Sequence, residues 1–453
     1  MRRDASWHDG ENVTAEDVLF TIKTIQNAAY KSPLRINWQG VRVEKIDEYT
    51  LQFTLPSPYT PFIENLSIGI LPKHLWEGVT PDQVTLHKLN MQPVGSGPYI
   101  SDGFRQNRDG TILSYSLARN SRYYRAGPYI KSIKFFFFKN GDELFSAWRR
   151  GAIEGFGPAA KSYLFELDQK KSMILALSTP RIFGIFFNQT KSKALAEKSV
   201  REAISLSLDK NKFTEGSDTT GLVRADSPLP WIDNTPSLSP SRSYDPIRAI
   251  EMLDHAGWTD EDGDGIREKA APSSKSGKAA QKERLEFALA TSDWPDLQKA
   301  AERIKSQLKE VGIEVKIEQM PFAELELSVI RPRNFEMLLF GQVYGYEPDP
   351  FAFWHSSQVK DPGLNIALYA NKKADQLLEE ARKTTDPELR ITRYQQVANI
   401  LTQDIPALFL FSQLYFYVLP SDIKGVELER ISLPADRFSG INTWYRSTTR
   451  IWK

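Results

Sequence analysis

The sequence predicts an α/β protein with mixed sheets. Helical periodicity of about 3.6 residues and strand-like alternation follow one another along the whole chain, as in layered α/β architectures. Two apolar runs, Ile130–Phe138 and Ile182–Phe187, are typical of strands that are buried on both faces. At 453 residues the chain is too long for one hydrophobic core, so we expect two or three domains.

The first 180 residues predict short helices among strands. Thr14 and Asp17 fit a capping box at the start of a helix. That helix carries Val18, Ile22 and Ile25 on one face, which we expect to be buried. Further strands are expected at Val41–Leu55, Ile112–Ala118 and Ile130–Phe138, with Phe135–Phe138 in the core, and a short helix at Leu144–Gly151.

The second half predicts longer helices between buried strands. Asp245 and Pro246 supply an N-cap and a first-turn proline, and Gly257 ends that helix. Pro295–Val311 is a strongly amphipathic helix that stops at Gly312. Helices are also expected from Lys198 through Leu208, over Ala374–Ala381, and from Asp386 and Pro387 through Leu401. Strands are expected over Ile182–Phe187, Leu285–Leu289, Ile313–Ile317, Met337–Phe340, Ala407–Phe411 and Leu414–Val418.

The composition excludes several classes of function. Fifty-eight Lys and Arg balance 57 Asp and Glu, so the net charge of +1 gives no electrostatic footprint for nucleic acid or a membrane surface. No apolar run approaches the ~20 residues of a membrane span. The absence of cysteine rules out disulfides, thiolate nucleophiles and cysteine-based zinc sites. We therefore expect no nucleic-acid partner and no cofactor.

The catalytic motifs that we searched for are also missing. The histidines are scattered without an H-E-x-x-H pair, and Gly95-Ser96-Gly97 is not a G-x-S-x-G nucleophile elbow. There is no P-loop and no G-x-G-x-x-G fingerprint. A pair of carboxylates far apart in the sequence is the one catalytic arrangement that stays open. We expect no catalytic residues, and a hydrolase is the less favoured alternative.

One acidic segment, Asp260–Glu268, resembles the start of a calcium loop. Asp260, Asp262, Asp264 and Gly265 follow the pattern D-x-D-x-D-G. The glutamate expected at the twelfth position of such a loop falls on Ala271, so the strongest ligand is missing. We therefore interpret the segment as a carboxylate-rich turn and expect no metal site.

The stretch Leu338–Gln358 is the strongest candidate for a binding surface. It begins as an apolar strand and continues as a Pro- and Gly-punctuated segment rich in aromatic residues. Aromatic bodies with polar tips suit a wet cleft that holds an organic molecule, although a loop packed by its own aromatic side chains is the alternative. The candidate ligand-binding residues in this stretch are Gly341, Gln342, Val343, Tyr344, Tyr346, Asp349, Trp354 and His355.

Residues outside this stretch complete the candidate site. Phe186 and Asn188 lie at the end of a buried strand, where we expect ligand contacts. Trp294, before the helix at Pro295, is either a cleft wall or a packing residue. His355 is either a donor to the ligand or a residue at a helix end with its ring satisfied by the backbone.

Six segments, in the same order along the chain, resemble segments of one family. Residues 7–18 are similar to its W-x-D-G-x-x-x-T-A-x-D-V segment, and residues 93–99 to its P-x-G-T/S-G-P-Y turn. Further matches are R-N…Y-Y at 119–124, F-N at 187–188 with V-R-x-A and D-K at 200–210, and Y-D-P…A-G-W…D-G-D-G-I-R at 244–267. The family is that of the extracytoplasmic solute-binding proteins of peptide/nickel-type ABC importers.

The resemblance implies a two-lobed, periplasmic-binding-protein-like fold that closes about a hinge on its ligand. Lobe one would comprise a peripheral subdomain, 1–92, and a sheet subdomain, 93–180 with 416–453, and lobe two would be 181–415. Family members begin upstream of residue 7, so we expect the N-terminal part of lobe one to be missing. The start of this chain shows no signal peptide.

The function implied by the resemblance is capture of oligopeptides or dipeptides outside the cytoplasmic membrane, in the periplasm or at the cell surface. The ligand-binding protein is expected to be a monomer that delivers its ligand to ABC permease subunits. In such a mechanism an extended peptide pairs with a strand edge near Gly341–Val343. An oligosaccharide or another small solute on the same scaffold is the alternative ligand.

The anchoring carboxylate departs from the pattern of the family's peptide binders, which place an Asp in a D-Y-x-x-P-like segment. Alignment on Pro348-Asp349-Pro350 puts Tyr346 at that position. Asp349 or Glu347 could take its place, and the segment resembles a D-P-D-P…W-H-S-S-Q variant of the family. On this interpretation Asp349→Ala weakens peptide binding by about tenfold or more.

Overall fold

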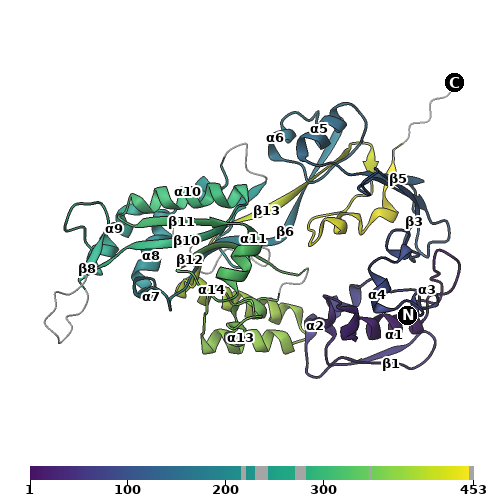
Figure 1. Ribbon diagram of the computed structural model, residues 1–453, viewed down its shortest axis with the longest axis horizontal. Helices are drawn as coiled ribbons and strands as arrows, with labels where there is room; N and C mark the ends of the chain where they lie inside the picture. Colours follow the sequence, from purple (N-terminus) through teal and green to yellow (C-terminus); the bar gives the residue numbers. More distant parts are fainter. Residues whose placement is uncertain (216–220, 230–242, 271–281, 346–348, 448–453) are drawn as a thin grey trace. The chain divides into compact units, whose positions relative to one another are not determined.

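The computed structural model describes residues 1–215, 221–229, 243–270, 282–345 and 349–447 (Figure 1). It divides into two compact units: Met1–Leu177 with Tyr415–Lys453, and Ser178–Leu414. The boundaries between them fall inside two long strands, β6 (Ser172–Phe187) and β13 (Ala407–Pro420). The finer division of lobe one at residue 92 stays a prediction.

The first unit begins with helix α1 (Ala15–Gln26). The predicted capping box is confirmed, because the Thr14 backbone N–H donates to an Asp17 carboxylate oxygen at 2.9 Å. The buried face of α1 packs with Trp38 against the hairpin of β1 (Arg42–Lys45) and β2 (Leu51–Thr54). Short helices complete this region: α2 (Arg35–Trp38), α3 (Lys73–Trp76), α4 (Pro81–Val84) and 3-10 turns at Ala28–Tyr30, Thr60–Ser67 and Lys88–Asn90.

A three-stranded antiparallel sheet forms the second part of this unit. Its order is β3 (Tyr99–Gln106), β4 (Ile112–Arg119) and β5 (Ser132–Phe136). The prediction that the Phe135–Phe138 run is core is wrong for two of its members, since Phe136 is 41% and Phe137 54% exposed. Strand β5 is an edge strand whose alternate residues, Phe136 among them, face away from the packed side, and Phe137 lies just beyond the end of this strand. The unit also holds α5 (Gly141–Arg149), α6 (Lys161–Leu164), β14 (Ile423–Lys424), β15 (Tyr445–Arg446) and 3-10 turns at Pro434–Phe438 and Ile441–Thr443.

The second unit is built on a six-stranded mixed sheet, as the sequence predicts. The strand order is β11-β10-β12-β6-β13-β7. Strand β10 is parallel to β11 and β12, whereas β12 is antiparallel to β6. The strands not yet given are β7 (Leu222–Arg224), β10 (Glu286–Ser292), β11 (Glu314–Met320) and β12 (Met337–Val343).

Helices cover both faces of this sheet (Figure 1). One core contains buried residues of α8 (Lys198–Ser207), α9 (Pro246–His255) and α10 (Pro295–Lys309). The other contains buried residues of α13 (Lys372–Lys383) and α14 (Pro387–Asp404). The remaining elements are α7 (Lys193–Ala196), α11 (Phe322–Glu324), α12 (Phe351–Trp354), β8 (Glu268–Ala270), β9 (Lys282–Arg284), a π turn at Leu325–Ile330 and 3-10 turns at Lys210–Phe213 and Ser356–Gln358.

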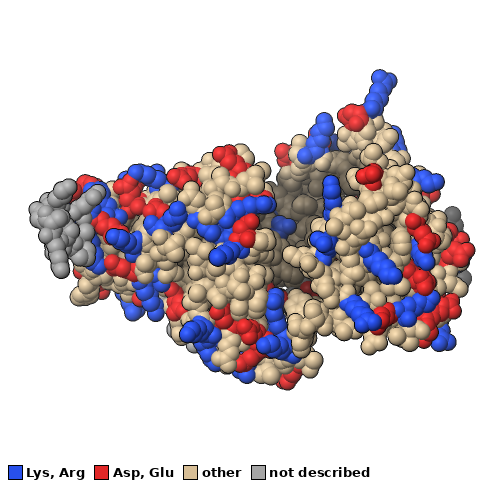
Figure 2. Space-filling model, turned by 60° about the horizontal axis from the view of Figure 1, so that its bottom comes forward, with Lys and Arg blue, Asp and Glu red and all other residues tan. Residues whose placement is uncertain are grey.

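The surface carries both signs of charge. Figure 2 shows Lys and Arg interspersed with Asp and Glu over the face in view, in keeping with the net charge of +1. Within the described residues, every helix falls short of the length and apolar character that a membrane span requires.

Candidate ligand-binding site

The candidate site of the second unit centres on an open edge of strand β12. On one side β12 pairs with β6 along its whole length, from Met337 to Val343. On the other side its pairing with β10 ends at Leu339. After β10 the chain stays beside β11, since the Asp293 N–H donates to the Met320 carbonyl oxygen at the end of β11. In the described part of the unit, no strand pairs with this side of β12 beyond Leu339.

Two residues of this open edge direct their backbone groups outwards. The Tyr344 N–H donates to Pro180 at 2.8 Å, and the Asn188 N–H donates to Glu336 at 2.9 Å. In an antiparallel ladder the paired groups alternate, so the even-numbered residues of β12 face β6. It follows that the N–H and C=O groups of Gly341 and Val343 point away from β6, towards the open side. The candidate residues Gly341 and Val343 thus offer donors and acceptors to an extended chain.

Aromatic side chains lie beside this edge. The Phe183 ring lies over Gly341, where an added Cβ would be 2.5 Å from a Phe183 ring carbon, so glycine is required for this close approach. The Trp294 ring centroid lies 5.2 Å from that of Phe183. Trp294 is partly exposed at the start of α10. Trp294 therefore packs against Phe183 and also leaves part of its side chain exposed beside the β12 edge. Both alternatives from the sequence, a packing residue and a cleft wall, are compatible with this position.

Gln342 and Tyr344 point into the unit rather than out of it. Trp354 Nε1 donates to the Tyr344 hydroxyl at 3.1 Å, and that hydroxyl donates to Gln342 Oε1 at 3.1 Å. All three side chains are buried, and burial raises the pKa of the Tyr344 hydroxyl above its usual value. This hydrogen-bonded chain fixes the start of the loop that follows β12.

Several candidate residues do not lie where the sequence placed them. The expectation that Tyr344, Trp354 and Phe186 line a ligand pocket does not fit the structure, because their side chains are in the core of the second unit. Asn188 is also fully buried, and its Nδ2 donates to the Arg333 carbonyl oxygen at 2.9 Å. The side chains of these residues therefore belong to the interior of the unit. Tyr346 lies outside the described residues.

Asp349 is engaged by a partner from helix α13. Arg382 donates to Asp349 Oδ2 through Nε at 2.9 Å and Nη2 at 2.7 Å. The Arg382 guanidinium also stacks on the Phe351 ring, with its carbon 3.6 Å from the ring centroid. The side chains of Asp349 and Arg382 are only 15% and 25% exposed. The geometry therefore supports a structural ion pair rather than an anchor for a ligand ammonium.

Replacing Asp349 by asparagine should lower the free energy of unfolding by about 1–3 kcal/mol, because the Arg382 charge loses its carboxylate in a mostly buried position. Urea unfolding of the whole protein measures the change. Glu326→Gln is a matched control, since its ion pair with Arg331 is largely exposed and is expected to contribute less than ~1 kcal/mol. Equal losses in the two variants would contradict the structural role of Asp349.

His355 lies at the end of α12. Its Nδ1 accepts from the Ser357 N–H at 3.1 Å and lies 2.7 Å from the Ser357 hydroxyl. Its ring stacks on Phe351 with a centroid separation of 4.0 Å, and the residue is 8% exposed. The other ring nitrogen, Nε2, has no hydrogen-bond partner in the described structure and lies 3.5 Å from a Glu379 carboxylate oxygen, so the role of His355 stays a prediction.

Sequence reasoning missed Arg382 and Phe183 as parts of this site. Arg382 is 33 positions from Asp349 and belongs to an ordinary amphipathic helix, so no local pattern indicates the pair. Phe183 could have been found, because a glycine in a strand marks a close approach by a neighbouring strand. Its cross-strand partner is Gly341.

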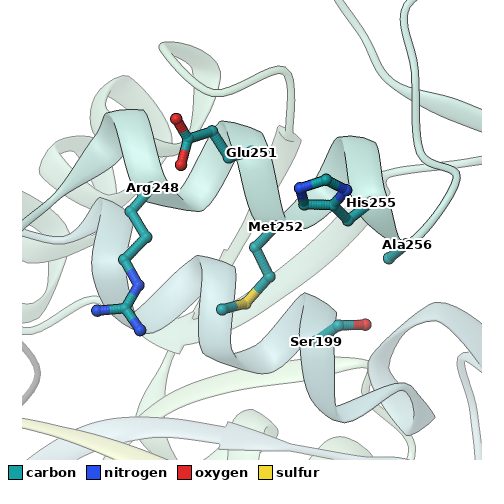
Figure 3. Close-up of a pocket in the computed structure, with 6 residues that line it drawn as sticks. All are labelled: Ser199, Arg248, Glu251, Met252, His255 and Ala256. Carbon is teal, nitrogen blue, oxygen red and sulfur yellow. The ribbon is translucent and has the colours of Figure 1, made fainter.

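Two further pockets lie away from the β12 edge. A surface pocket of ≈ 450 Å³ lies between α8 and α9 (Figure 3). It contains Ser199 and His255, but no hydrogen bond joins these two described residues, so the pocket offers no preformed nucleophile–base pair. A larger cavity of ≈ 820 Å³ in the first unit is lined by β5 and by aromatic residues that include Tyr417, Phe438 and Trp444.

Most of the chain is similar to known solute-binding proteins. A family model described as bacterial extracellular solute-binding proteins, family 5 Middle, matches residues 1–363. The oligopeptide-binding protein AppA of Bacillus subtilis is 27% identical over 435 residues, which cover 94% of this chain and 77% of that protein.

Solved structures extend the similarity to the fold. The structure of Bacillus subtilis AppA in complex with a nonapeptide has a TM-score of 0.71 at 25% identity, covering 99% of this chain and 86% of that one. The crystal structure of a protein called AppA from Clostridium difficile has a TM-score of 0.80 at 24% identity, covering 99% of this chain and 88% of that one. At this identity the similarity to the Clostridium difficile structure shows a shared fold only.

Proposed function

The chain belongs to family 5 of the bacterial extracellular solute-binding proteins, and we propose that it binds oligopeptides along the open edge of β12. The observation that carries the proposal is the outward direction of the Gly341 and Val343 backbone groups beyond the last residue that pairs with β10. The Bacillus subtilis relative is named an oligopeptide-binding protein, and its solved structure contains a nonapeptide.

An edge of this kind recognises what all peptides share. Backbone N–H and C=O groups of an extended ligand pair with those of Gly341 and Val343, so affinity does not depend on one side-chain sequence. Trp294 then provides an apolar surface beside the ligand. Asp349 is not part of this mechanism, because its carboxylate is bound to Arg382.

The proposed place in transport follows from the family. The protein is the solute-binding component of an ABC importer, without catalytic activity, and works as a monomer in the periplasm or at the cell surface. The chain passes between its two units within β6 and β13, and these strands are the proposed hinge. Ligand favours the arrangement of the units that the permease recognises.

Thermal unfolding with two ligand pools tests the proposal. A pool of di- to nonapeptides should raise the melting temperature by several degrees, since a ligand at a hundredfold excess over its Kd adds about 2.7 kcal/mol to the stability of the folded state. A pool of oligosaccharides should leave it unchanged. A shift with the oligosaccharides alone would overturn the peptide assignment and favour the alternative ligand class.

A further inference from the structure

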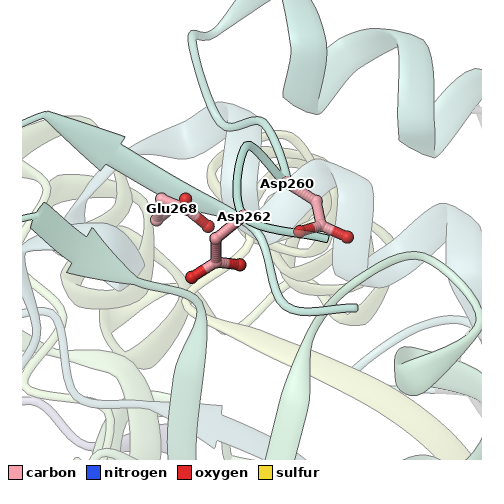
Figure 4. A group of neighbouring side chains, drawn as sticks. All are labelled: Asp260, Asp262 and Glu268. Carbon is pink, nitrogen blue, oxygen red and sulfur yellow. The ribbon is translucent and has the colours of Figure 1, made fainter. Parts of the chain in front are cut away.

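Three acidic side chains come together in the second unit, away from the β12 edge. They are Asp260 and Asp262, in the turn after α9, and Glu268, the first residue of β8 (Figure 4). One carboxylate oxygen from each lies within 4.8 Å of the others. Two oxygens bound to one Ca²⁺ at 2.3–2.6 Å can be at most ~5 Å apart, so the three are close enough to share an ion.

Glu268 distinguishes this group from an ordinary acidic turn. Its side chain is only 2% exposed, yet its Oε2 has no hydrogen-bond partner in the described structure. The other oxygen, Oε1, accepts from the Lys282 ammonium at 2.9 Å. A buried carboxylate oxygen without a partner is costly, and a bound cation would satisfy it.

Glu268 also supplies the strong carboxylate ligand that the sequence pattern of the loop lacks at its twelfth position. The twelfth position of the loop, where calcium loops carry a glutamate, is Ala271. In the structure the ninth position supplies the carboxylate, because the loop runs directly into β8. Reciprocal backbone hydrogen bonds between Thr259 and Glu268 hold it in place. Gly265, at the sixth position, has φ +88°, the conformation for which calcium loops use glycine.

The local charge balance favours a further cation. The segment carries five carboxylates, at residues 260, 261, 262, 264 and 268. Lys282 pairs with Glu261 and Glu268, and Arg284 with Asp262 and Asp264, whereas Arg267 pairs with Asp254 outside this group. An excess of three negative charges therefore remains. The Lys282 side chain, which bridges Glu261 and Glu268, is 45% exposed and can turn to solvent without a desolvation cost.

We propose that Asp260, Asp262 and Glu268 bind one Ca²⁺, which takes the place of the Lys282 ammonium at Glu268. All the ligand atoms are oxygens, which suits a hard cation, and a carboxylate-rich loop tolerates the irregular six- to eight-fold coordination of Ca²⁺ better than the octahedron that Mg²⁺ requires. The ion joins the turn to the start of β8 and stabilises the second unit. This site is separate from the proposed peptide-binding edge.

Calorimetric titration of the whole protein with CaCl2, after treatment with a chelator, tests the site. We expect one Ca²⁺ per chain with a Kd of about 10⁻⁴–10⁻³ M, the range of extracellular calcium modules. Glu268→Gln and Asp262→Asn should each weaken binding by about tenfold or more. Glu261→Gln is the matched control: it removes the same charge from the same loop, but its carboxylate is outside the cluster, so the affinity should change by less than about threefold.

The outcomes separate clearly. Absence of calcium binding in the unmodified protein would overturn the proposal, as would equal effects of Glu268→Gln and Glu261→Gln, and tighter binding of MgCl2 would overturn the choice of ion. Circular dichroism checks that Glu268→Gln folds. Asp262 is 54% exposed, so Asp262→Asn tests the site even if the buried substitution disturbs the fold. Peptide binding is measured separately, so failure of one proposal does not decide the other.

Discussion

Replacing Val343 by proline should weaken peptide binding by about tenfold or more and leave the free energy of unfolding nearly unchanged. The Val343 N–H points to the open side of β12, so its loss removes no hydrogen bond to β6. A peptide that pairs with this edge loses one backbone hydrogen bond and meets the proline ring. Such a bond contributes ~0.5–1.5 kcal/mol, and 1.4 kcal/mol is about tenfold in affinity.

Val343→Ala is the matched control for this variant. It removes the exposed side chain but keeps the backbone donor, so the affinity should stay within about threefold of the original protein. Titration calorimetry with one peptide taken from the pool gives both affinities, and urea unfolding gives both stabilities. If proline and alanine weaken binding equally, the side chain and not the strand edge carries recognition, and the pairing mechanism is wrong.

The sequence predicted well the features that depend on neighbouring residues. The capping box at Thr14 and the proline after the Asp245 N-cap follow from local chemistry, and both are present. Ile182–Phe187 is buried on both faces, as an apolar run in a central strand should be. Phe136 and Phe137 belong to an equally apolar run, but they lie at the end of an edge strand and just beyond it. Whether a strand is central or at an edge is set by the whole fold, so the local sequence does not predict it.

The candidate site shows the same limit. The sequence indicated the stretch, and the proposal of Gly341 and Val343 as the binding edge rests on a register that only the pairing of three strands defines. Aromatic content indicated Tyr344 and Trp354 equally well as core or as pocket, and tertiary packing decided for the core. The sequence suggested that Asp349 could bind a ligand ammonium, because its ion-pair partner, Arg382, belongs to a helix distant in the sequence.

The largest loss of stability is expected at a residue that the sequence marked only as part of a family-like segment. Arg201 of α8 is 5% exposed, and burial lowers the pKa of its guanidinium, which still remains charged at neutral pH. It donates to carbonyl oxygens at two helix ends. These are Leu195 and Ala196 at the end of α7, at 2.8 and 3.0 Å, and Asp404 and Ile405 at the end of α14, at 2.8 and 2.9 Å.

Arg201→Met should therefore lower the free energy of unfolding by about 3–5 kcal/mol. Methionine fills similar space but leaves the four carbonyls without their charged donor at helix ends that favour a cation. Urea unfolding, followed by circular dichroism and tryptophan fluorescence, measures the loss. Lys198→Met is the control on the same helix, because Lys198 is 53% exposed and its ion pair with Glu202 is long, at 3.9 Å.

Arg201→Lys separates the contribution of charge from that of geometry. A lysine ammonium keeps the positive charge near both helix ends but has three donors on a single atom, whereas the planar guanidinium reaches four carbonyls from two directions. We expect lysine to recover less than about half of the loss caused by methionine. Full recovery would show that the macrodipole interaction alone explains the effect. Partial recovery would assign the stability to the fork of hydrogen bonds that joins α7, α8 and α14.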